Sequence, residues 1–458
     1  MTSTIQQFDT TALAAQVAGP VLSPGTPGYD DEVAGFNVAH RPAPAVVIGA
    51  TNAADIAAGV RWANEHGLPV RAQSTGHGLT GDLAGTVLIS TRRLTQLSVD
   101  PDARTARIGA GVRWRAVIDA AVPHGLAPLN GSSSNVGVVG YTLGGGIGPM
   151  ARRYGFAADH VRSLTVVSAA GEIRTVDAGN SPDLFWAMRG GKVGFGVVTE
   201  IVIDLVPVSR FFGGGIFFPG TSASAVLLAW RSWAKSLPDE VSTSVALLRL
   251  PPDPQLPPPL QGQFVVHLRY THLGDAEEAA GLLGPLRGVA PVLIDTLAEL
   301  PYSAIDAVHM DPTSPMPCYD RGLTLTELPT EAIDALIEVA GADSGSAVTL
   351  AEVRLLGGAL SSPPAVANAV VGRKAAYSVY VLGVPAGPAA AQVPNQVDAV
   401  VDALNPWRAG SLLNFVGHAD PGELAGLWSA PDRQRLRQTA ERYDPANTFG
   451  AAEIFGSR

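Results

Sequence analysis

The chain has 458 residues, more than one hydrophobic core usually supports, so two lobes are expected. Apolar residues make up 46% and charged residues 16%, which is a globular composition. A net charge of −10 argues against nucleic acid as a partner, and the lack of any uninterrupted apolar stretch of about 18 residues argues against a membrane span. No basic segment followed by an apolar one opens the chain, so a cytoplasmic location is expected.

The first half of the chain is predicted to form short strands and helices joined by glycine turns. Capping signals and periodicity predict helices over Asp55–His66 and Trp114–Pro123. Leu164–Val167 and Ile173–Val176 are predicted to pair as a hairpin. Further strands are expected at Leu68–Ala72, Thr86–Ser90, Ala106–Gly109 and Phe195–Val206.

Longer strands with helices between them are predicted from about residue 210 onward. Helices are expected at Ala223–Leu237 and Asp275–Leu286, and the proline-rich Pro251–Leu260 is expected to be an exposed connection between two strands. The pattern predicts one large antiparallel sheet covered on one face. After Gly410, a short strand and a helix through Arg433–Arg442 are expected. The predicted strands are Phe211–Phe218, Val241–Leu250, Gln263–Thr271, Pro291–Leu297, Ala347–Leu356 and Ala375–Val384.

Four glycine-rich clusters lie in the first half of the chain, at residues 74–78, 109–111, 137–148 and 189–191. Glycines allow the backbone to approach a large flat or anionic ligand and expose amide groups to phosphates. One cluster is explained by turns, but four in the same lobe favour a long cofactor laid against the backbone.

Other catalytic signatures fail on their context. Residues 146–151 satisfy G-x-G-x-x-A, but Gly155 follows too early for a full crossover helix, and Glu172 lies in a hairpin turn instead of ending a second parallel strand. No G-x-S-x-G is present, and Val193 after Lys192 rules out a Walker A loop. With one cysteine, Cys318, and no closely spaced histidine pair, no metal site is expected.

His77 stands out because small residues surround it, so its imidazole has room to lie beside a bulky ring. A neutral imidazole is a competent nucleophile toward an activated carbon. The alternative is an ordinary loop histidine.

Ordered motifs extend this reading: TGHG, GSSSNVGVVGYTLGGGIG, YGFAADHV, SPDLFWAMRGG, GFGVVTE and ERYDPANTF. Together they resemble the berberine bridge enzyme-like flavin oxidases, the family that includes 6-hydroxy-D-nicotine oxidase. The resemblance implies an α+β fold: a two-lobed FAD-binding domain of the vanillyl-alcohol oxidase type with an inserted antiparallel-sheet-plus-helices substrate domain. The expected parts are an N-terminal segment (1–39) packing on the FAD domain, the FAD-binding domain (40–207), the substrate domain (208–410) and a C-terminal return (411–458).

The resemblance also implies how FAD is held. His77 is expected to bond covalently to the 8α-methyl carbon, and Ser133 replaces the cysteine that makes a second link in many relatives. Val136 leaves room for oxygen near flavin C4a, which favours an oxidase. The expected FAD contacts are His77, Gln73, Ser74, Thr75, Gly76, Gly78, Ser132, Ser133, Val136, Gly137, Gly140, Tyr141, Gly146, Val198 and Asn414.

Three departures from the family pattern leave the proton acceptor open. Leu412 replaces the tyrosine of the family's Y-x-N motif, Gln73 stands where an arginine is usual, and Lys192-Val193-Gly194 replaces the usual glycines and asparagine.

The leading candidate for the base is Tyr141, provided that a cation such as Arg354 lowers its pKa. Glu352 and Arg354 share one face of a strand and either face the flavin or form a solvent-facing ion pair. On the next strand, Tyr377 and Tyr380 are expected on opposite faces. His418 either reaches the site or lies in a surface turn.

The resemblance implies a two-electron oxidation of a small or medium organic molecule such as an alcohol, amine, sugar or biosynthetic intermediate, with O2 as acceptor and H2O2 as product. Three alternatives stay open: a flavin-dependent dehydrogenase, an oxygenase or cyclase of secondary metabolism, and a binding protein with a degenerate site. A monomer or homodimer is expected.

Overall fold

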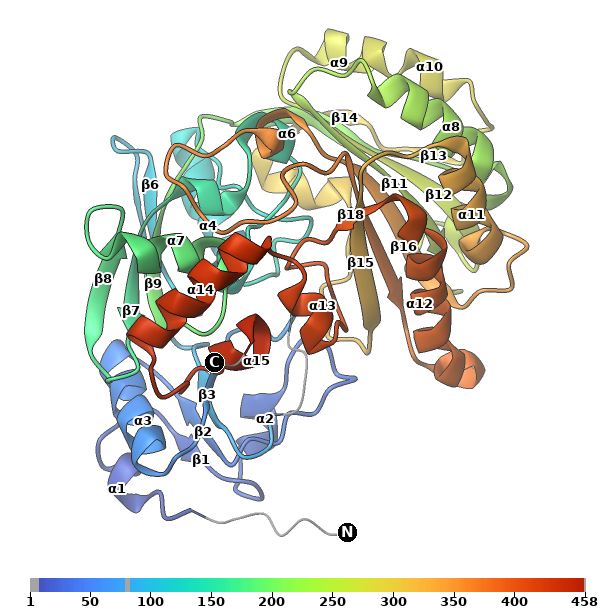
Figure 1. The fold of residues 1–458 in the computed structure, drawn as a ribbon. Helices are drawn as coiled ribbons and strands as arrows, with labels where there is room; N and C mark the ends of the chain where they lie inside the picture. Colours follow the sequence, from blue (N-terminus) through green and yellow to red (C-terminus); the bar gives the residue numbers. More distant parts are fainter. Residues whose placement is uncertain (1–7, 79–82, 457–458) are drawn as a thin grey trace.

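The computed structural model describes residues 8–78 and 83–456, which form two lobes (Figure 1). Two sheets lie in the first lobe, one of four strands and one of five, and a sheet of nine strands lies in the second. No helix in the described ranges is both long enough and apolar enough to cross a membrane. The domain boundaries at 39, 207 and 410 stay predictions.

The four-stranded sheet has the order β1-β2-β4-β3, from β1 (Val21–Leu22), β2 (Val46–Gly49), β4 (Val87–Ser90) and β3 (Val70–Gln73). Its last three strands are parallel, so β2 and β3 need a crossover connection, which α3 (Ala53–Glu65) supplies. Asn52 caps α3 by accepting a hydrogen bond from the Asp55 backbone N–H. The predicted helix and the two strands that follow it are confirmed.

The five-stranded sheet is antiparallel and has the order β5-β6-β9-β7-β8. The predicted hairpin is confirmed as β7 paired with β8, and Glu172 lies in the turn between them. The helix after the G-x-G-x-x-A segment is only four residues long, which agrees with rejecting a dinucleotide fold. The strands are β5 (Leu97–Asp100), β6 (Thr105–Gly109), β9 (Val197–Asp204), β7 (Val161–Val167) and β8 (Ile173–Asp177).

The remaining helices of the first lobe and those of the C-terminal segment pack on these two sheets or on one another (Figure 1). They are α1 (Thr11–Ala14), α2 (Tyr29–Val33), α4 (Trp114–Ala121), α5 (Val138–Leu143), α7 (Pro182–Gly191), α13 (Pro421–Ala425), α14 (Ala430–Tyr443) and α15 (Ala451–Phe455). The short helix α6 (Ala151–Tyr154) instead packs against the second lobe.

The sheet of the second lobe is antiparallel with the order β13-β10-β12-β11-β16-β17-β15-β18, and β14 also pairs with β10. The large antiparallel sheet is therefore confirmed, with more strands than expected. The sequence did not predict β15, because Asp320-Arg321-Gly322 resembles a turn. The glycine is needed in this strand for space, since a Cβ on Gly322 would lie 2.3 Å from the backbone oxygen of Phe415. The strands are β10 (Arg210–Pro219), β11 (Val241–Arg249), β12 (Phe264–His272), β13 (Ile294–Asp295), β14 (Ala298–Pro301), β15 (Tyr319–Leu325), β16 (Val348–Leu355), β17 (Tyr377–Gly383) and β18 (Arg408–Gly410).

One face of this sheet is apolar and covered by helices, as predicted (Figure 1). Val245, Leu268 and Val353 point into that core, so the alternate residues of the same strands point the other way. Tyr377 lies in the core, whereas Tyr380 donates to Asp320 on the opposite face, as their spacing predicted. The covering helices are α8 (Ala223–Ala234), α9 (Ala276–Leu282), α10 (Gly284–Arg287), α11 (Thr330–Ala340) and α12 (Val393–Ala403).

The segment after Gly410 corrects one prediction. Between residues 411 and 456 the structure has no strand; it has only an isolated bridge between Arg321 and Gly417. Gly417 has φ +66° and presses against the backbone of Asp320, a conformation that does not continue a ladder. Pro251–Leu260 is confirmed as a connection, joining the paired strands β11 and β12.

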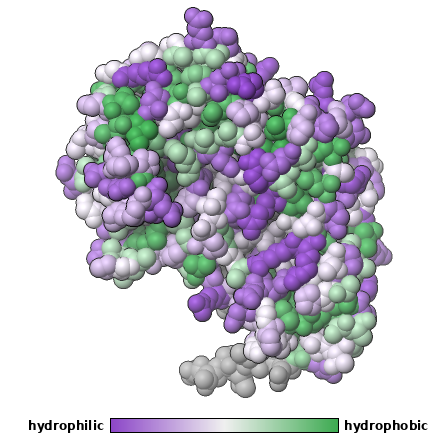
Figure 2. Space-filling view, turned by 180° about the vertical axis from the view of Figure 1, so that it is seen from behind, coloured by the Kyte–Doolittle hydropathy of each residue, from purple (hydrophilic) through white to green (hydrophobic). Residues whose placement is uncertain are grey.

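The surface shows no broad apolar face in the view from behind, where hydrophilic and hydrophobic residues are interspersed (Figure 2). The large apolar side chains that are exposed lie scattered along the described chain: Val38, Ile173, Val193, Val292, Met310 and Val366.

Candidate active site

His77 lies on the loop that leaves β3 and is held by two contacts. Its ring stacks on Phe36, with centroids 4.0 Å apart and an interplanar angle of 13°, and Nδ1 is 2.8 Å from Thr75 Oγ1. Burial, together with the charge of Arg113, lowers the pKa of His77 to about 4. The imidazole is therefore neutral at neutral pH, which is its nucleophilic form.

The His77 loop touches the start of α5, as the motifs require if they share one ligand. A Cβ on Gly137 would lie 3.3 Å from Ser74 Oγ and 3.4 Å from Thr75 Cγ2. Gly140, one helical turn along, is exposed and borders open space, because a Cβ there would meet no atom within 4 Å. The Ser74 hydroxyl is buried without a hydrogen-bond partner among the described residues. An open backbone surface and an unsatisfied hydroxyl fit a large polar ligand such as FAD.

Tyr141 packs its ring between two glycines of the same segment. Cβ atoms on Gly131 and Gly146 would approach the ring to 2.8 and 2.4 Å, and Trp114 contacts it edge-on at 5.5 Å. The hydroxyl is buried, with no hydrogen-bond partner in the described ranges. Burial raises the pKa of Tyr141 well above its usual value, and the charge of Arg354 offsets only part of this. The lowered pKa that a base role needs is absent.

Asn414 fastens the C-terminal segment to this helix. Its Nδ2 donates to the backbone oxygen of Tyr141 (2.8 Å), and its Oδ1 accepts from Lys192 Nζ (3.1 Å). Burial lowers the pKa of Lys192 to about 8. Lys192 Nζ also lies close to Gly78, because a Cβ on that glycine would be 3.5 Å from it. Lys192, one of the departures from the family pattern, therefore places a cation beside two predicted FAD contacts, Gly78 and Asn414.

The other predicted FAD contacts divide into loop and core positions. Gln73 donates to the backbone oxygens of residues 33 and 34, and its Oε1 is buried without a described partner. Val198 lies in the core of the first lobe. Ser132, Ser133 and Val136 are partly buried on the segment before α5. The backbone of Gly76 packs closely against that of Gly35. Flavin contacts of all these residues stay predictions.

A buried charge cluster lies on the polar face of the second lobe's sheet. Ser244 is the cross-strand partner of both Arg269 and Arg354. Glu352 contacts both arginines, at 2.9 and 3.0 Å, and accepts from Ser244 Oγ at 2.6 Å. With Glu352 3% exposed and Arg354 8% exposed, the solvent-facing alternative for this pair is wrong.

Glu352 is a weak candidate for a base. Burial would raise the pKa of Glu352, but Arg354, Arg269 and His309, with the Ser244 hydrogen bond, outweigh it and hold the pKa well below its usual range. A carboxylate stabilised in this way holds two cations and gives little driving force for taking a proton.

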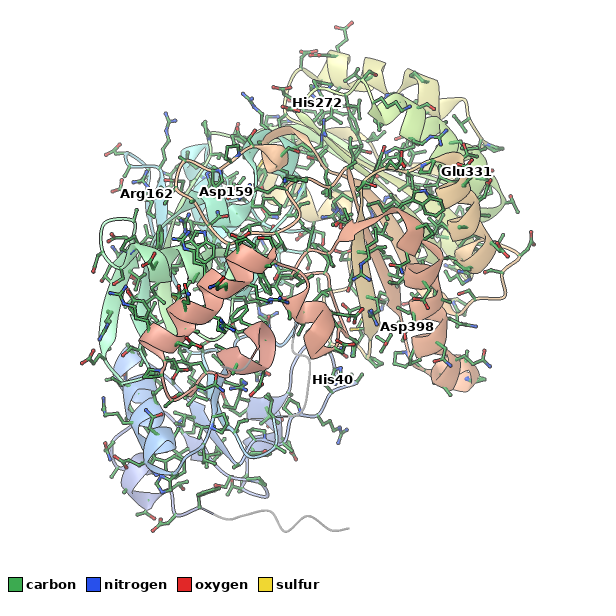
Figure 3. The ribbon with its side chains drawn as sticks, viewed as in Figure 1. His40, Asp159, Arg162, His272, Glu331 and Asp398 are labelled. Carbon is green, nitrogen blue, oxygen red and sulfur yellow. The ribbon has the colours of Figure 1, made fainter. Side chains whose placement is uncertain are left out.

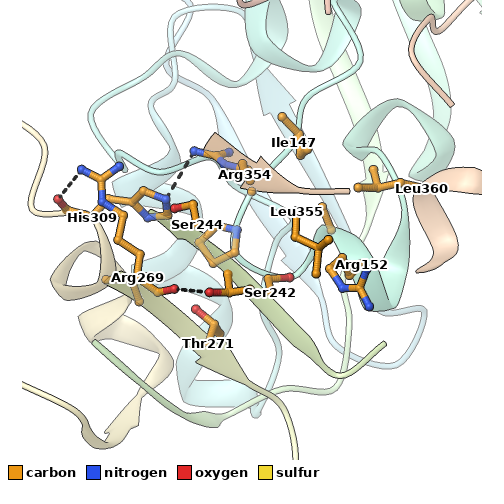
Figure 4. A pocket seen from close by; sticks show the side chains of 15 residues that line it. Ile147, Arg152, Ser242, Ser244, Arg269, Thr271, His309, Arg354, Leu355 and Leu360 are labelled. Carbon is orange, nitrogen blue, oxygen red and sulfur yellow. Dashed lines mark hydrogen bonds between the residues drawn. The ribbon is translucent and has the colours of Figure 1, made fainter. Parts of the chain in front are cut away.

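The charge cluster borders a cavity of about 20 Å³ at the junction of the lobes (Figure 4). His309 enters it after a 3-10 helix (Tyr302–Val308) and lies 3.3 Å from Arg354 Nη2. The first lobe contributes Ile147, Gly148, Pro149, Ala151 and Arg152, and the second contributes Ser242, Thr243, Ser244, Arg269, Thr271, Val308, His309, Arg354, Leu355 and Leu360.

Several of these residues were missed from the sequence. Arg269 is central to the cluster, and a signal for it exists: His267, Arg269 and Thr271 alternate with apolar residues in one strand. Phe36 and His309 lie in irregular segments without a motif, so no local signal marks them.

His418 lies in a different cluster. Its Nε2 is 2.7 Å from Nε2 of His40, near α13 (Figure 3), and its ring stacks on Tyr319 at 4.3 Å. Its backbone N–H donates to Asp320 O. His418 does not line the cavity of Figure 4, so the structure gives no support to its predicted catalytic role.

Comparisons with known proteins agree with the fold and the loops. Residues 44–177 match the family model of the FAD binding domain. The chain is 28% identical over 309 residues to (R)-6-hydroxynicotine oxidase of Paenarthrobacter nicotinovorans, an alignment that covers 66% of this chain and 65% of that protein, just under two thirds of its length.

Two further matches cover nearly the whole chain. An uncharacterized FAD-linked oxidoreductase of Bacillus subtilis (strain 168) is 25% identical over 454 residues, covering 95% of this chain and 97% of that protein. The structure of berberine bridge enzyme-like 1 of Physcomitrella patens aligns with a TM-score of 0.84 at 20% identity, covering 100% of both chains. The chain is thus similar in sequence to FAD-linked oxidoreductases, contains a segment that matches the FAD binding domain, and has the two-lobed fold of the berberine bridge enzyme-like structure.

Proposed function

We propose that the protein is an oxidase with FAD attached covalently through His77 alone, which takes a hydride from a small or medium organic substrate and uses O2 as acceptor to give H2O2. FAD, when bound, supplies the redox chemistry. The observation that carries the proposal is the neutral, stacked imidazole of His77 on a loop pressed against Gly137.

Each first-lobe group has a role in holding the cofactor. Thr75 fixes the orientation of the His77 ring, and Phe36 keeps its plane in place. Gly137 lets the His77 loop pack closely on the start of α5, and Gly140 leaves the backbone open to a flat ligand. Ser133 cannot form a thioether, so a single link is expected.

We assign substrate binding to the second lobe, and two first-lobe residues, Tyr141 and Val136, act on the reaction from the other side. Tyr141 keeps its proton at neutral pH, so its hydroxyl is a donor to a substrate or cofactor oxygen, with no role as base. The partly buried Val136 is small enough to leave a path for oxygen, which favours an oxidase over a dehydrogenase.

Covalent attachment is tested on the purified protein by acid precipitation and peptide mapping. Yellow colour should stay with the precipitate, the flavin-bearing peptide should contain His77, and His77→Ala should release the colour. His66→Ala, which changes an exposed histidine, serves as the matched control. Colour that washes out of the wild type contradicts covalent attachment.

The oxidase activity is tested by screening for peroxide with alcohols, amines, sugars and biosynthetic intermediates. A substrate that bleaches the flavin, followed by rapid recolouring in air with one peroxide formed per turnover, is expected. Recolouring only with an artificial acceptor contradicts an oxidase and indicates a dehydrogenase.

A further inference from the structure

The two arginines of the charge cluster differ in how their donors are used. Arg269 has partners for all three guanidinium nitrogens: Nε lies 3.2 Å from His267 Nδ1, Nη1 lies 2.9 Å from Glu352, and Nη2 lies 3.4 Å from the backbone oxygen of His309. Arg354 uses Nη2 for Glu352 and His309, whereas its Nη1 is buried with no hydrogen-bond partner among the described residues.

The ion pairs are shared unevenly between the two arginines. Glu352 contacts both of them, and Asp311, which is partly solvated and lies 3.9 Å from Arg269, adds a second carboxylate beside Arg269. Glu352 is the one carboxylate in contact with Arg354 among the described residues. His309 adds no positive charge, because burial, Arg269 and Arg354 lower its pKa well below the usual value and keep the ring neutral. A buried guanidinium nitrogen without an acceptor is costly, so a partner from outside the chain is expected at Nη1 of Arg354.

The cavity beside Arg354 offers further unsatisfied groups. Thr271 lines it, and its Oγ1 is buried without a described partner, as is Nδ1 of His309. Ile147, Leu355 and Leu360 add apolar walls (Figure 4). About 20 Å³ holds one or two water-sized groups, so the cavity fits the charged end of a molecule and not a whole substrate.

We infer that Arg354 and Thr271 bind a carboxylate on the substrate of the proposed oxidase, so that the substrate is an organic acid with an apolar body. This inference rests on the proposed function for its reporter, the flavin. A carboxylate matches the guanidinium donor in charge and geometry, and Thr271 supplies a hydroxyl donor for its oxygen. Glu352 positions Arg354 from the opposite side of the guanidinium.

Binding to the purified yellow protein tests the inference with benzoate and benzamide, which share a ring and differ in charge. Benzoate should perturb the flavin absorbance saturably, and benzamide should not at the same concentration. Arg354→Met should raise the Kd for benzoate about 10- to 150-fold, the range for a hydrogen bond to a charged group. Arg210→Met, an exposed arginine on the same sheet, should leave it unchanged.

Thr271→Val keeps the measurement informative if Arg354→Met does not fold, because Thr271 lies outside the ion-pair network. It should raise the Kd for benzoate about 2- to 10-fold, as for a neutral hydrogen bond. The covalent flavin content of each variant reports whether it has folded.

Three outcomes overturn the inference: benzamide binding as tightly as benzoate, an unchanged Kd in both Arg354→Met and Thr271→Val, or chloride competing as strongly as benzoate, which indicates an inorganic anion site. A wild-type protein that carries no flavin contradicts the proposed function itself, which separates the two failures.

Discussion

The two lobes meet with different kinds of surface. The first lobe presents loops and a short helix in which glycine leaves the backbone bare, as at Gly140. The second presents a regular sheet whose side chains carry the chemistry, with Arg269 on β12 and Glu352 and Arg354 on β16, on either side of β11. Backbone surfaces suit a constant cofactor, and side chains on a rigid sheet suit a variable substrate. Changes in the two surfaces should therefore separate cofactor attachment from substrate chemistry.

The largest effect is expected for Glu352→Gln, which leaves two buried arginines without their shared counter-charge. Removing one partner of a buried pair costs about 3–5 kcal/mol, and such a loss lowers the thermal midpoint of a lobe of this size by roughly 6–20 °C. Thermal unfolding followed by circular dichroism measures it.

Glu331→Gln, at an exposed position of α11 (Figure 3), is the control and should change stability by less than about 0.5 kcal/mol. Covalent flavin content should be equal in both variants. A Glu352→Gln protein as stable as the wild type, or one that loses its flavin, breaks the division between the lobes.

Val136→Ile tests the first-lobe surface facing oxygen. Crowding of about 1–2 kcal/mol is typical of an added methylene in a packed site, which slows reoxidation of the reduced enzyme about 5- to 30-fold. Flavin reduction by substrate should hardly change. Stopped-flow measurement of both half-reactions tests this prediction. Equal rates of reoxidation by oxygen in the two proteins would contradict a role of Val136 in oxygen access.

Tyr141→Phe tests where the two surfaces meet. Because burial keeps the phenol protonated, removing the hydroxyl should cost one hydrogen bond to the bound substrate or cofactor and slow flavin reduction by no more than about tenfold. The pH profile of that step should keep its shape. Loss of a limb that rises toward alkaline pH, with a fall of about 10²–10⁴-fold, identifies Tyr141 as the base after all.

The smallest effect concerns the pH dependence of flavin attachment. With a folded pKa of about 4, His77 is already neutral at pH 5.5, so raising the pH to 7.5 adds almost no nucleophile. An unperturbed histidine would gain about tenfold in neutral fraction over the same range. Rates of covalent incorporation into apoprotein should stay flat between these pH values, and a tenfold rise contradicts the burial of His77.

The sequence predicts the two lobes unevenly. The His77 loop and the segment from Gly131 to Gly148 were identified because each motif is contiguous and needs glycine for steric reasons. Arg269 and His309 were not identified. The strand register brings Arg269 near Arg354, and an irregular segment brings His309 there, so neither residue has a motif in its neighbouring sequence. The raised pKa of Tyr141 could not be predicted from the sequence either, because it depends on burial of the ring by Gly131, Gly146 and residues of the opposite lobe.

A crystal structure of the purified yellow protein tests the central claim most directly. Electron density should run without a break from the His77 imidazole to the flavin, with the ring system between the α5 segment and the polar face that carries Arg354. Density for a flavin detached from His77, or placed on the helix-covered side of the second lobe, would contradict the assignment of the cofactor to the first lobe and the substrate to the second.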